Sequence, residues 1–148
     1  MRILLVNGPN LNALGQREPH LYGYDTLDQI LDRVETRAAE LGAEIAAYQD
    51  NREGALIDFI QQNQTGSDGL IINAGGYSHT SIALRDAIAG SGLNAIEVHI
   101  SNVYAREAFR HESMLAGVCK GMITGLGWRG YLYALEFLVG LSEESRTK

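Results

Sequence analysis

The stretch Gly69-Leu-Ile-Ile-Asn73-Ala-Gly-Gly-Tyr-Ser-His79 contains the features that decide the fold. Its first five residues form a short apolar run, and a glycine-rich turn follows at once. A helical pattern then extends from about Ser81 to Ala89. A short, continuously apolar run bounded by turn residues is typical of a strand in a buried sheet. The stretch therefore predicts a strand, a turn and a helix in succession, which is the building unit of α/β proteins.

The same alternation continues in both directions from this stretch. Four further strands are predicted at Arg2–Val6, Glu44–Gln49, Ala95–Ile100 and Gly121–Thr124. Helical patterns separate them at about 27–41 and 53–62, and a last helix is expected at about 128–139 with a frayed tail at 143–148. Together these elements predict a flavodoxin-like, doubly wound, five-stranded parallel sheet with helices on both faces. One domain is expected over residues 1–148.

The helix at about 27–41 has recognisable ends. Thr26 is suited to be its N-cap, and Gln29 three residues later completes a capping box. Gly42 is expected to close the helix at its other end.

Composition excludes several classes of function. The formal net charge of −6 argues against a nucleic-acid partner, which would require a basic face. No apolar run reaches the roughly 18 to 20 residues of a membrane span. The single cysteine, Cys119, fits a reducing cytoplasm and is expected to be a small buried side chain. The four histidines and one cysteine show no zinc-like spacing, so no metal site is predicted.

Three of the predicted strands end in polar segments that should form a binding site. They run into Asn7-Gly-Pro-Asn-Leu-Asn12, Asn73–His79 and His99-Ile-Ser-Asn102. Ligands of doubly wound sheets bind beyond the carboxyl ends of the strands, where these segments should meet. The loop from Asn7 to Gly23, about 17 residues, is longer than most connections and is a candidate lid.

Taken singly, each polar residue of this region also has a structural interpretation as part of a turn, a helix cap, a buried core or a solvated face. The residues concerned are Asn10, Asn12, Arg17, Tyr22, His79, Arg85, Asp86 and His99. The two asparagines, for example, could simply close a turn around Pro9. The convergence of the set on one predicted edge favours a functional site.

The segment Gly125-Leu-Gly-Trp-Arg-Gly130 matches the G-x-G-x-x-G pattern of dinucleotide-binding loops. It joins a predicted strand to a helix, but no strand follows to supply the acidic residue that binds the ribose. Close packing of the last helix on the sheet explains these glycines better, and no cofactor is predicted.

Several motifs in one order resemble those of the type II dehydroquinases, lyases that dehydrate 3-dehydroquinate to 3-dehydroshikimate. The motifs are Asn7–Asn12, Gly15-Gln-Arg-Glu-Pro19 with Tyr22-Gly23, Asn73–Ser81, and Glu97–Asn102 with Ala105-Arg-Glu107 and Phe109-Arg110. The resemblance continues through Gly130-Tyr131 and covers nearly the whole chain. It implies a cytoplasmic hydro-lyase of the shikimate pathway, in aromatic amino acid and chorismate biosynthesis, or of quinate breakdown.

The resemblance also implies roles for individual residues. Tyr22 would be the base, His99 the acid, and Arg17 the group that stabilises charge on the tyrosinate and the enolate. The implied substrate-binding residues are Asn73, His79, Asp86, Ile100, Ser101 and Arg110, with Asn10 and Asn12 in supporting positions. The family's assembly implies a homododecamer built from trimers, in which Asp86 reaches a neighbouring subunit's site.

The residue types suit this chemistry. A free phenol titrates near pH 10, and an adjacent guanidinium favours its ionised form. A histidine can donate a proton to a departing hydroxyl near neutral pH. An imine mechanism would need a lysine, and the chain contains only Lys120 and Lys148, neither of which is expected at the ligand edge.

Five positions depart from the commoner family pattern. Arg52, Tyr104 and Glu112 stand where histidines are frequent, and Ala74 and Gly76 differ within the turn after Asn73. None is implicated in catalysis, so the expected effect is on subunit contacts and on affinity.

Two other functions remain open at this stage. A flavodoxin-like ligand-binding or signalling module would share the fold, although a phosphoacceptor receiver would need carboxylates where Asn7 and Asn73 stand. Another enzyme of small hydroxy acids could use the same set of arginine, tyrosine and histidine.

Overall fold

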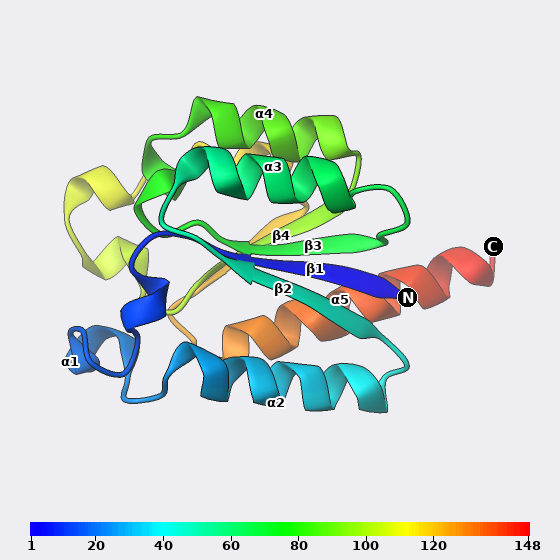
Figure 1. Ribbon diagram of the computed structural model, residues 1–148, viewed down its shortest axis with the longest axis horizontal. Coiled ribbons are helices and arrows are strands. Elements are labelled where there is room, and N and C mark those ends of the chain that lie inside the picture. Colours follow the sequence, from blue (N-terminus) through cyan, green and yellow to red (C-terminus); the bar gives the residue numbers. More distant parts are fainter.

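The computed structural model describes all 148 residues and contains one parallel sheet (Figure 1). Its strands are β1 (Arg2–Asn7), β2 (Glu44–Gln49), β3 (Gly69–Asn73), β4 (Asn94–His99) and β5 (Gly121–Thr124). They lie in the order β2-β1-β3-β4-β5, and every neighbouring pair is parallel. This is the doubly wound, flavodoxin-like α/β fold that the sequence predicted, and its topological switch point lies between β1 and β3.

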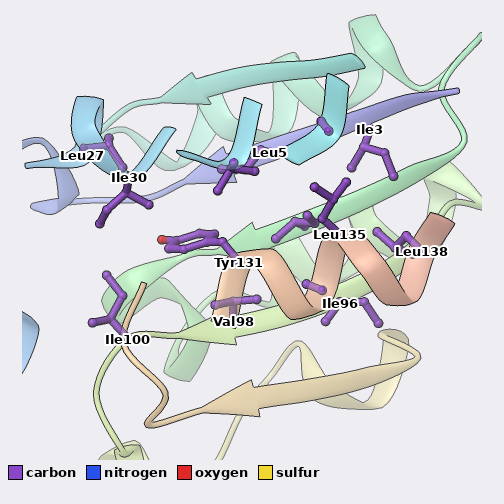
Figure 2. Close-up of a cluster of buried hydrophobic side chains, with 14 of the residues drawn as sticks. Ile3, Leu5, Leu27, Ile30, Ile96, Val98, Ile100, Tyr131, Leu135 and Leu138 are labelled. Carbon is purple, nitrogen blue, oxygen red and sulfur yellow. The ribbon is translucent and has the colours of Figure 1, made fainter. Parts of the chain in front are cut away.

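Helices cover both faces of the sheet (Figure 1). The helices α2 (Leu27–Glu40) and α5 (Arg129–Arg146) pack on one face, and α3 (Glu53–Asn63) and α4 (Ile82–Ser91) pack on the other. The alternating side chains of β1 show the two layers directly, because Ile3 and Leu5 join one apolar cluster while Leu4 and Val6 join the other. The cluster between the sheet, α2 and α5 is drawn in Figure 2.

No helix of the chain combines the length and the apolar character that are needed to cross a membrane.

Helix α5 and the long loop after β1 contain more helix than the sequence predicted. Helix α5 continues to Arg146, so the tail at 143–148 is not frayed as expected. Its buried residues end at Val139, and the polar turns beyond propagate a helix that packing has already nucleated. The long loop after β1 contains a 3-10 turn at Leu11–Ala13 and the one-turn helix α1 at Pro19–Tyr22.

The predicted capping box of α2 is confirmed. The Gln29 backbone N–H donates to the Thr26 hydroxyl at 3.2 Å, and the Thr26 N–H donates to the Gln29 side-chain oxygen at 2.9 Å. Both contacts satisfy N–H groups that have no partner within the helix.

Substitution of Thr26 by alanine should therefore lower the free energy of unfolding by about 1 kcal/mol, since one capping contact is lost. Thr36→Ala is the matched control, because the Thr36 hydroxyl only donates to the Asp32 carbonyl inside the same helix. Urea unfolding followed by circular dichroism measures both variants. An equal loss of stability in the two variants would contradict a specific capping contribution.

Candidate active site

A cavity of about 130 Å³ opens beyond the carboxyl ends of β1, β3 and β4, next to the switch point. Fifteen residues line it: Pro9, Asn10, Leu11, Arg17, Tyr22, Asn73, Gly75, Gly76, His79, His99, Ile100, Ser101, Val103, Arg106 and Arg110. The segments that follow the three strands therefore meet at one edge, as the sequence predicted. A space of this size suits a compact polar ligand.

The lining is cationic although the protein as a whole is acidic. It contains three arginines and two histidines and no aspartate or glutamate, whereas the chain has a formal net charge of −6. A concave surface lined by one sign of charge concentrates ligands of the opposite sign. The cavity is therefore suited to an anion.

The loops that follow β1 and β3 are packed tightly together at the floor of the cavity. A Cβ on Gly8 would lie 2.4 Å from the backbone oxygen of Ala74, so only glycine fits there. The Gly8 N–H donates to the Asn73 carbonyl at 2.8 Å. Asn10 then has a left-handed backbone with φ of 71°, which asparagine tolerates, and its N–H donates to the Asn51 side chain at 3.0 Å.

The long loop after β1 places Tyr22 beside two guanidinium groups. The Arg17 guanidinium lies over the Tyr22 ring, with Cζ 5.1 Å from the ring centroid. The Arg106 Nη1 donates to the Tyr22 hydroxyl at 2.8 Å and to the Ser101 hydroxyl at 3.1 Å. Because the Arg106 side chain is only 11% exposed, water screens these contacts weakly. Arg106 therefore joins the long loop after β1 to the segment after β4 and brings a cation to the phenol oxygen.

His99 is held by a buried carboxylate. Glu97 and His99 are two residues apart on β4, so their side chains lie on the same face of the sheet. The His99 Nε2 bonds the Glu97 carboxylate, and the second carboxylate oxygen accepts a 2.6 Å hydrogen bond from the Ser113 hydroxyl. Glu97 is fully buried, so these two contacts provide the hydrogen-bond partners that water cannot supply. The arrangement fixes the His99 ring and leaves its Nδ1 available.

Two further side chains face the cavity with fixed orientations. The His79 Nδ1 lies 2.7 Å from the Glu112 carbonyl oxygen, which can only accept, so Nδ1 carries the proton and Nε2 is left for another partner. Arg110 donates to Glu107 at 2.6 Å. The departure at Glu112 leaves the site intact, since its contact with His79 is made by the backbone.

Nine of the eleven residues predicted for the site line the cavity: Asn10, Arg17, Tyr22, Asn73, His79, His99, Ile100, Ser101 and Arg110. The other two lie elsewhere in the monomer. Asn12 is exposed and lines an adjacent hollow with Gln16 and Asp28. Asp86 is exposed on the outer surface of α4, in a hollow shared with α3.

Two residues that contact Tyr22 and His99 were not predicted to have a role in the site. Arg106 belongs to the segment Ala105-Arg-Glu107, and Glu97 stands two residues before His99 on the same strand. A charged residue inside a continuously buried strand was a usable signal for Glu97. Nothing local distinguishes Arg106 from Arg110.

The alternative sites considered in the sequence have structural explanations. A Cβ on Gly130 would lie 3.3 Å from Ile123 and Val98, so this glycine serves close packing of α5 on the sheet. Cys119 is half-buried and not fully buried as expected. Its partial burial, together with the nearby Glu97 carboxylate, raises the pKa of the thiol to about 12, which suppresses its nucleophilic form. No group of three or more histidine, cysteine, aspartate or glutamate side chains is placed to hold a metal ion.

Arg52 and Tyr104, which also depart from the common family pattern, each lie beside a neighbouring side chain. Arg52 forms a hydrogen-bonded ion pair with Asp50, at 3.0 and 2.9 Å, on the outer surface. The Tyr104 ring lies 5.8 Å from that of His111 between centroids.

The fold and the cavity define a doubly wound α/β protein with a pocket lined by arginine, histidine and tyrosine side chains at the carboxyl edge of its sheet. The chain belongs to the class II dehydroquinase family, since the family model described as "Dehydroquinase class II" matches residues 1–139. This confirms the resemblance that the sequence motifs indicated.

Individual relatives agree with this membership. A 3-dehydroquinate dehydratase from Roseiflexus castenholzii is 54% identical over 140 residues, which cover 95% of this chain and 89% of the relative. A protein from Aspergillus flavus named catabolic 3-dehydroquinase 2 is 53% identical over 145 residues, covering 95% and 97%. The crystal structure of a type II dehydroquinase from Butyrivibrio crossotus superposes with a TM-score of 0.91 at 46% identity, covering 93% of this chain and 97% of that one.

Proposed function

We infer that this chain is a 3-dehydroquinate dehydratase that works through an enolate, with Tyr22 as the base and His99 as the acid. Membership of the family supports the reaction, which removes water from 3-dehydroquinate to give 3-dehydroshikimate. The observation that carries the mechanism is the cavity itself, where a phenol hydroxyl, three guanidinium groups and a carboxylate-paired imidazole line one small space.

The substrate's functional groups match the lining. Its carboxylate would bind at Ile100 and Ser101, within the cationic part of the cavity, and its ring hydroxyls would face Asn73, His79 and Arg110. Asn10 at the floor would help to hold a water molecule near the developing enolate oxygen, where fixed donors lower the barrier.

The first step would be removal of a C2 proton by the Tyr22 phenolate, which leaves the enolate of the neighbouring ketone. A cation in contact with a phenol oxygen favours its ionised form, and Arg106 donates to that oxygen at 2.8 Å. Arg17 over the ring adds a second positive charge. We therefore assign to both arginines the stabilising role that the sequence had suggested for Arg17 alone.

The second step would be expulsion of the C1 hydroxyl as water, with its proton supplied by His99. The Glu97 carboxylate holds the ring in place and stabilises the imidazolium before the transfer. An imine route has no support in the lining, because neither Lys120 nor Lys148 lines the cavity and Lys120 lies at the amino end of β5. No cofactor enters this scheme.

The function is tested by ultraviolet absorbance, since product formation creates a conjugated enone. The wild-type protein should convert 3-dehydroquinate, and Tyr22→Phe should lower turnover by about two orders of magnitude or more through loss of the base. Tyr24→Phe is the matched control, because Tyr24 is 82% exposed and does not line the cavity. Near wild-type turnover in Tyr22→Phe would remove this residue from the mechanism.

The role of His99 is tested by separating the two steps. His99→Ala should impair water loss more than exchange of the C2 proton with solvent, because the enolate can still form and revert without the acid. Deuterium exchange into recovered substrate, measured by NMR, reports the first step, and enone absorbance reports both. An equal fall in the two rates would assign His99 to substrate positioning instead.

We also propose that the sites are completed between subunits of a homododecamer built from trimers. Asp86 is exposed and lies outside the cavity of its own chain, which fits a contact with a neighbouring subunit's site.

Mixed assemblies of Arg17→Ala and Asp86→Ala subunits should then recover activity that neither variant has alone, because some sites would contain both intact residues. Assemblies are mixed by co-expression with two different tags and purified on both. Absence of recovery in such doubly tagged assemblies would show that each site is built within one chain.

A further inference from the structure

A buried tyrosine of α5 connects the ends of the two strands at the switch point. The Tyr131 hydroxyl donates to the Asn7 side-chain oxygen at 2.6 Å and accepts from the Asn73 side-chain nitrogen at 2.9 Å. Asn7 and Asn73 are the last residues of β1 and β3 and lie opposite each other in the sheet. Of the three residues, only Asn73 also lines the cavity.

Core packing explains the ring of Tyr131 but not its hydroxyl group. Tyr131 is fully buried among apolar side chains between α5 and the sheet, and Figure 2 shows its ring between Leu5 and Val98. A phenylalanine would fill the same volume without burying a polar atom, whose burial carries a cost unless it is hydrogen-bonded. Burial also raises the pKa of Tyr131, so the hydroxyl keeps its proton.

The number of protons fixes the orientation of the Asn73 amide. A phenol has one proton, and Tyr131 gives it to Asn7, so toward Asn73 it can only accept. The amino group of Asn73 must then face Tyr131, and the carbonyl oxygen must face the Gly75 N–H, which donates to it at 3.3 Å. If the amide were turned over, its oxygen would face a lone pair and its amino group would face another donor.

The side chain of Asn7 is the last acceptor of a network whose direction is set by the Gly75 N–H, because a backbone N–H can only donate. Its oxygen takes the Tyr131 proton, while its own amino group is buried without a hydrogen-bond partner. A buried donor without a partner is destabilising, so this orientation of the Asn7 amide is retained for the bond that its oxygen makes. Asn7 therefore acts as the acceptor that directs the tyrosine proton away from Asn73.

We propose that Tyr131 is a positioning residue for the reaction, which holds the Asn73 amide with its carbonyl oxygen available to a substrate hydroxyl. The long contact to Gly75 leaves this oxygen able to accept a second hydrogen bond. The inference rests on the proposed function, because it needs a hydroxylated substrate in the cavity. It extends the site to a helix that does not line the cavity.

The proposal is tested by a double-mutant cycle on the kinetics of dehydroquinate conversion. Tyr131→Phe should lower kcat/KM by about tenfold, mainly through a higher KM, because a substrate hydrogen bond is no longer preoriented. In an Asn73→Ala background the same change should cost less than about twofold, since the amide through which it acts is gone. Tyr133→Phe, two residues along α5 and 45% exposed, is the matched control and should leave the kinetics unchanged.

A second variant covers the case in which Tyr131→Phe folds poorly. Asn7→Ala removes the acceptor, frees the tyrosine proton and should lower kcat/KM in the same direction, again with little effect when Asn73 is alanine. All assays are run well below the melting temperature of each variant, as measured by circular dichroism. An equal loss with and without the Asn73 side chain, or wild-type kcat/KM in Tyr131→Phe, would overturn the proposal. Absence of turnover in the wild-type protein would count against the proposed function instead.

Discussion

The register between β1 and β3, which places Asn7 opposite Asn73, is the constraint on which the site depends. These strands are neighbours in the sheet but leave it toward opposite faces, so their ends diverge and open a crevice. The close approach of Gly8 to Ala74 ties the two exits together and keeps the crevice narrow. A slip of one residue in this register would turn Asn73 away from Tyr131, because alternate residues point to opposite faces.

The cavity concentrates positive charge in an acidic protein, and the arrangement of carboxylates explains how this is possible. Glu97 is buried behind His99, and Glu107 contacts Arg110 and Arg106 from outside the cavity. The acidic groups therefore hold the cationic side chains in place while none of them lines the ligand space. This geometry offsets part of the mutual repulsion of the cations, which still line the cavity. It also gives the proposed acid and base different partners, since His99 contacts a carboxylate and Tyr22 contacts guanidinium groups.

Strands and most helices could be predicted from the sequence because each depends on local patterns. The runs Gly69–Asn73 and Gly121–Thr124 each begin with glycine and are followed by a glycine-containing turn, and their predicted limits match the structure. The fold then followed from the alternation of elements and the handedness of crossovers. The predicted end of α5 was wrong for a physical reason. The apolar pattern stops after Val139, where packing against the sheet ends. The helix nevertheless continues, because each further turn needs only the turn before it. The short helix α1 was missed because one turn has no periodicity to detect.

The loops that form the site could be predicted from the sequence, but most contacts between their side chains could not. The rule that ligands bind at strand ends located Asn73 and His99 without any knowledge of side-chain direction. Contacts across the fold depend on that direction: Arg106 and Tyr22 are 84 positions apart, and Tyr131 and Asn7 are 124 apart. No spacing in the sequence relates such pairs, and a buried tyrosine at a helical core position resembles ordinary core packing. The direction of a hydrogen bond is even harder to predict from the sequence. It depends on where the single Tyr131 hydroxyl proton can go once Asn7, Asn73 and Gly75 are in place. Asn73 illustrates the difference, since its presence at the strand end follows from the sequence while the orientation of its amide follows only from Tyr131, Asn7 and Gly75 together.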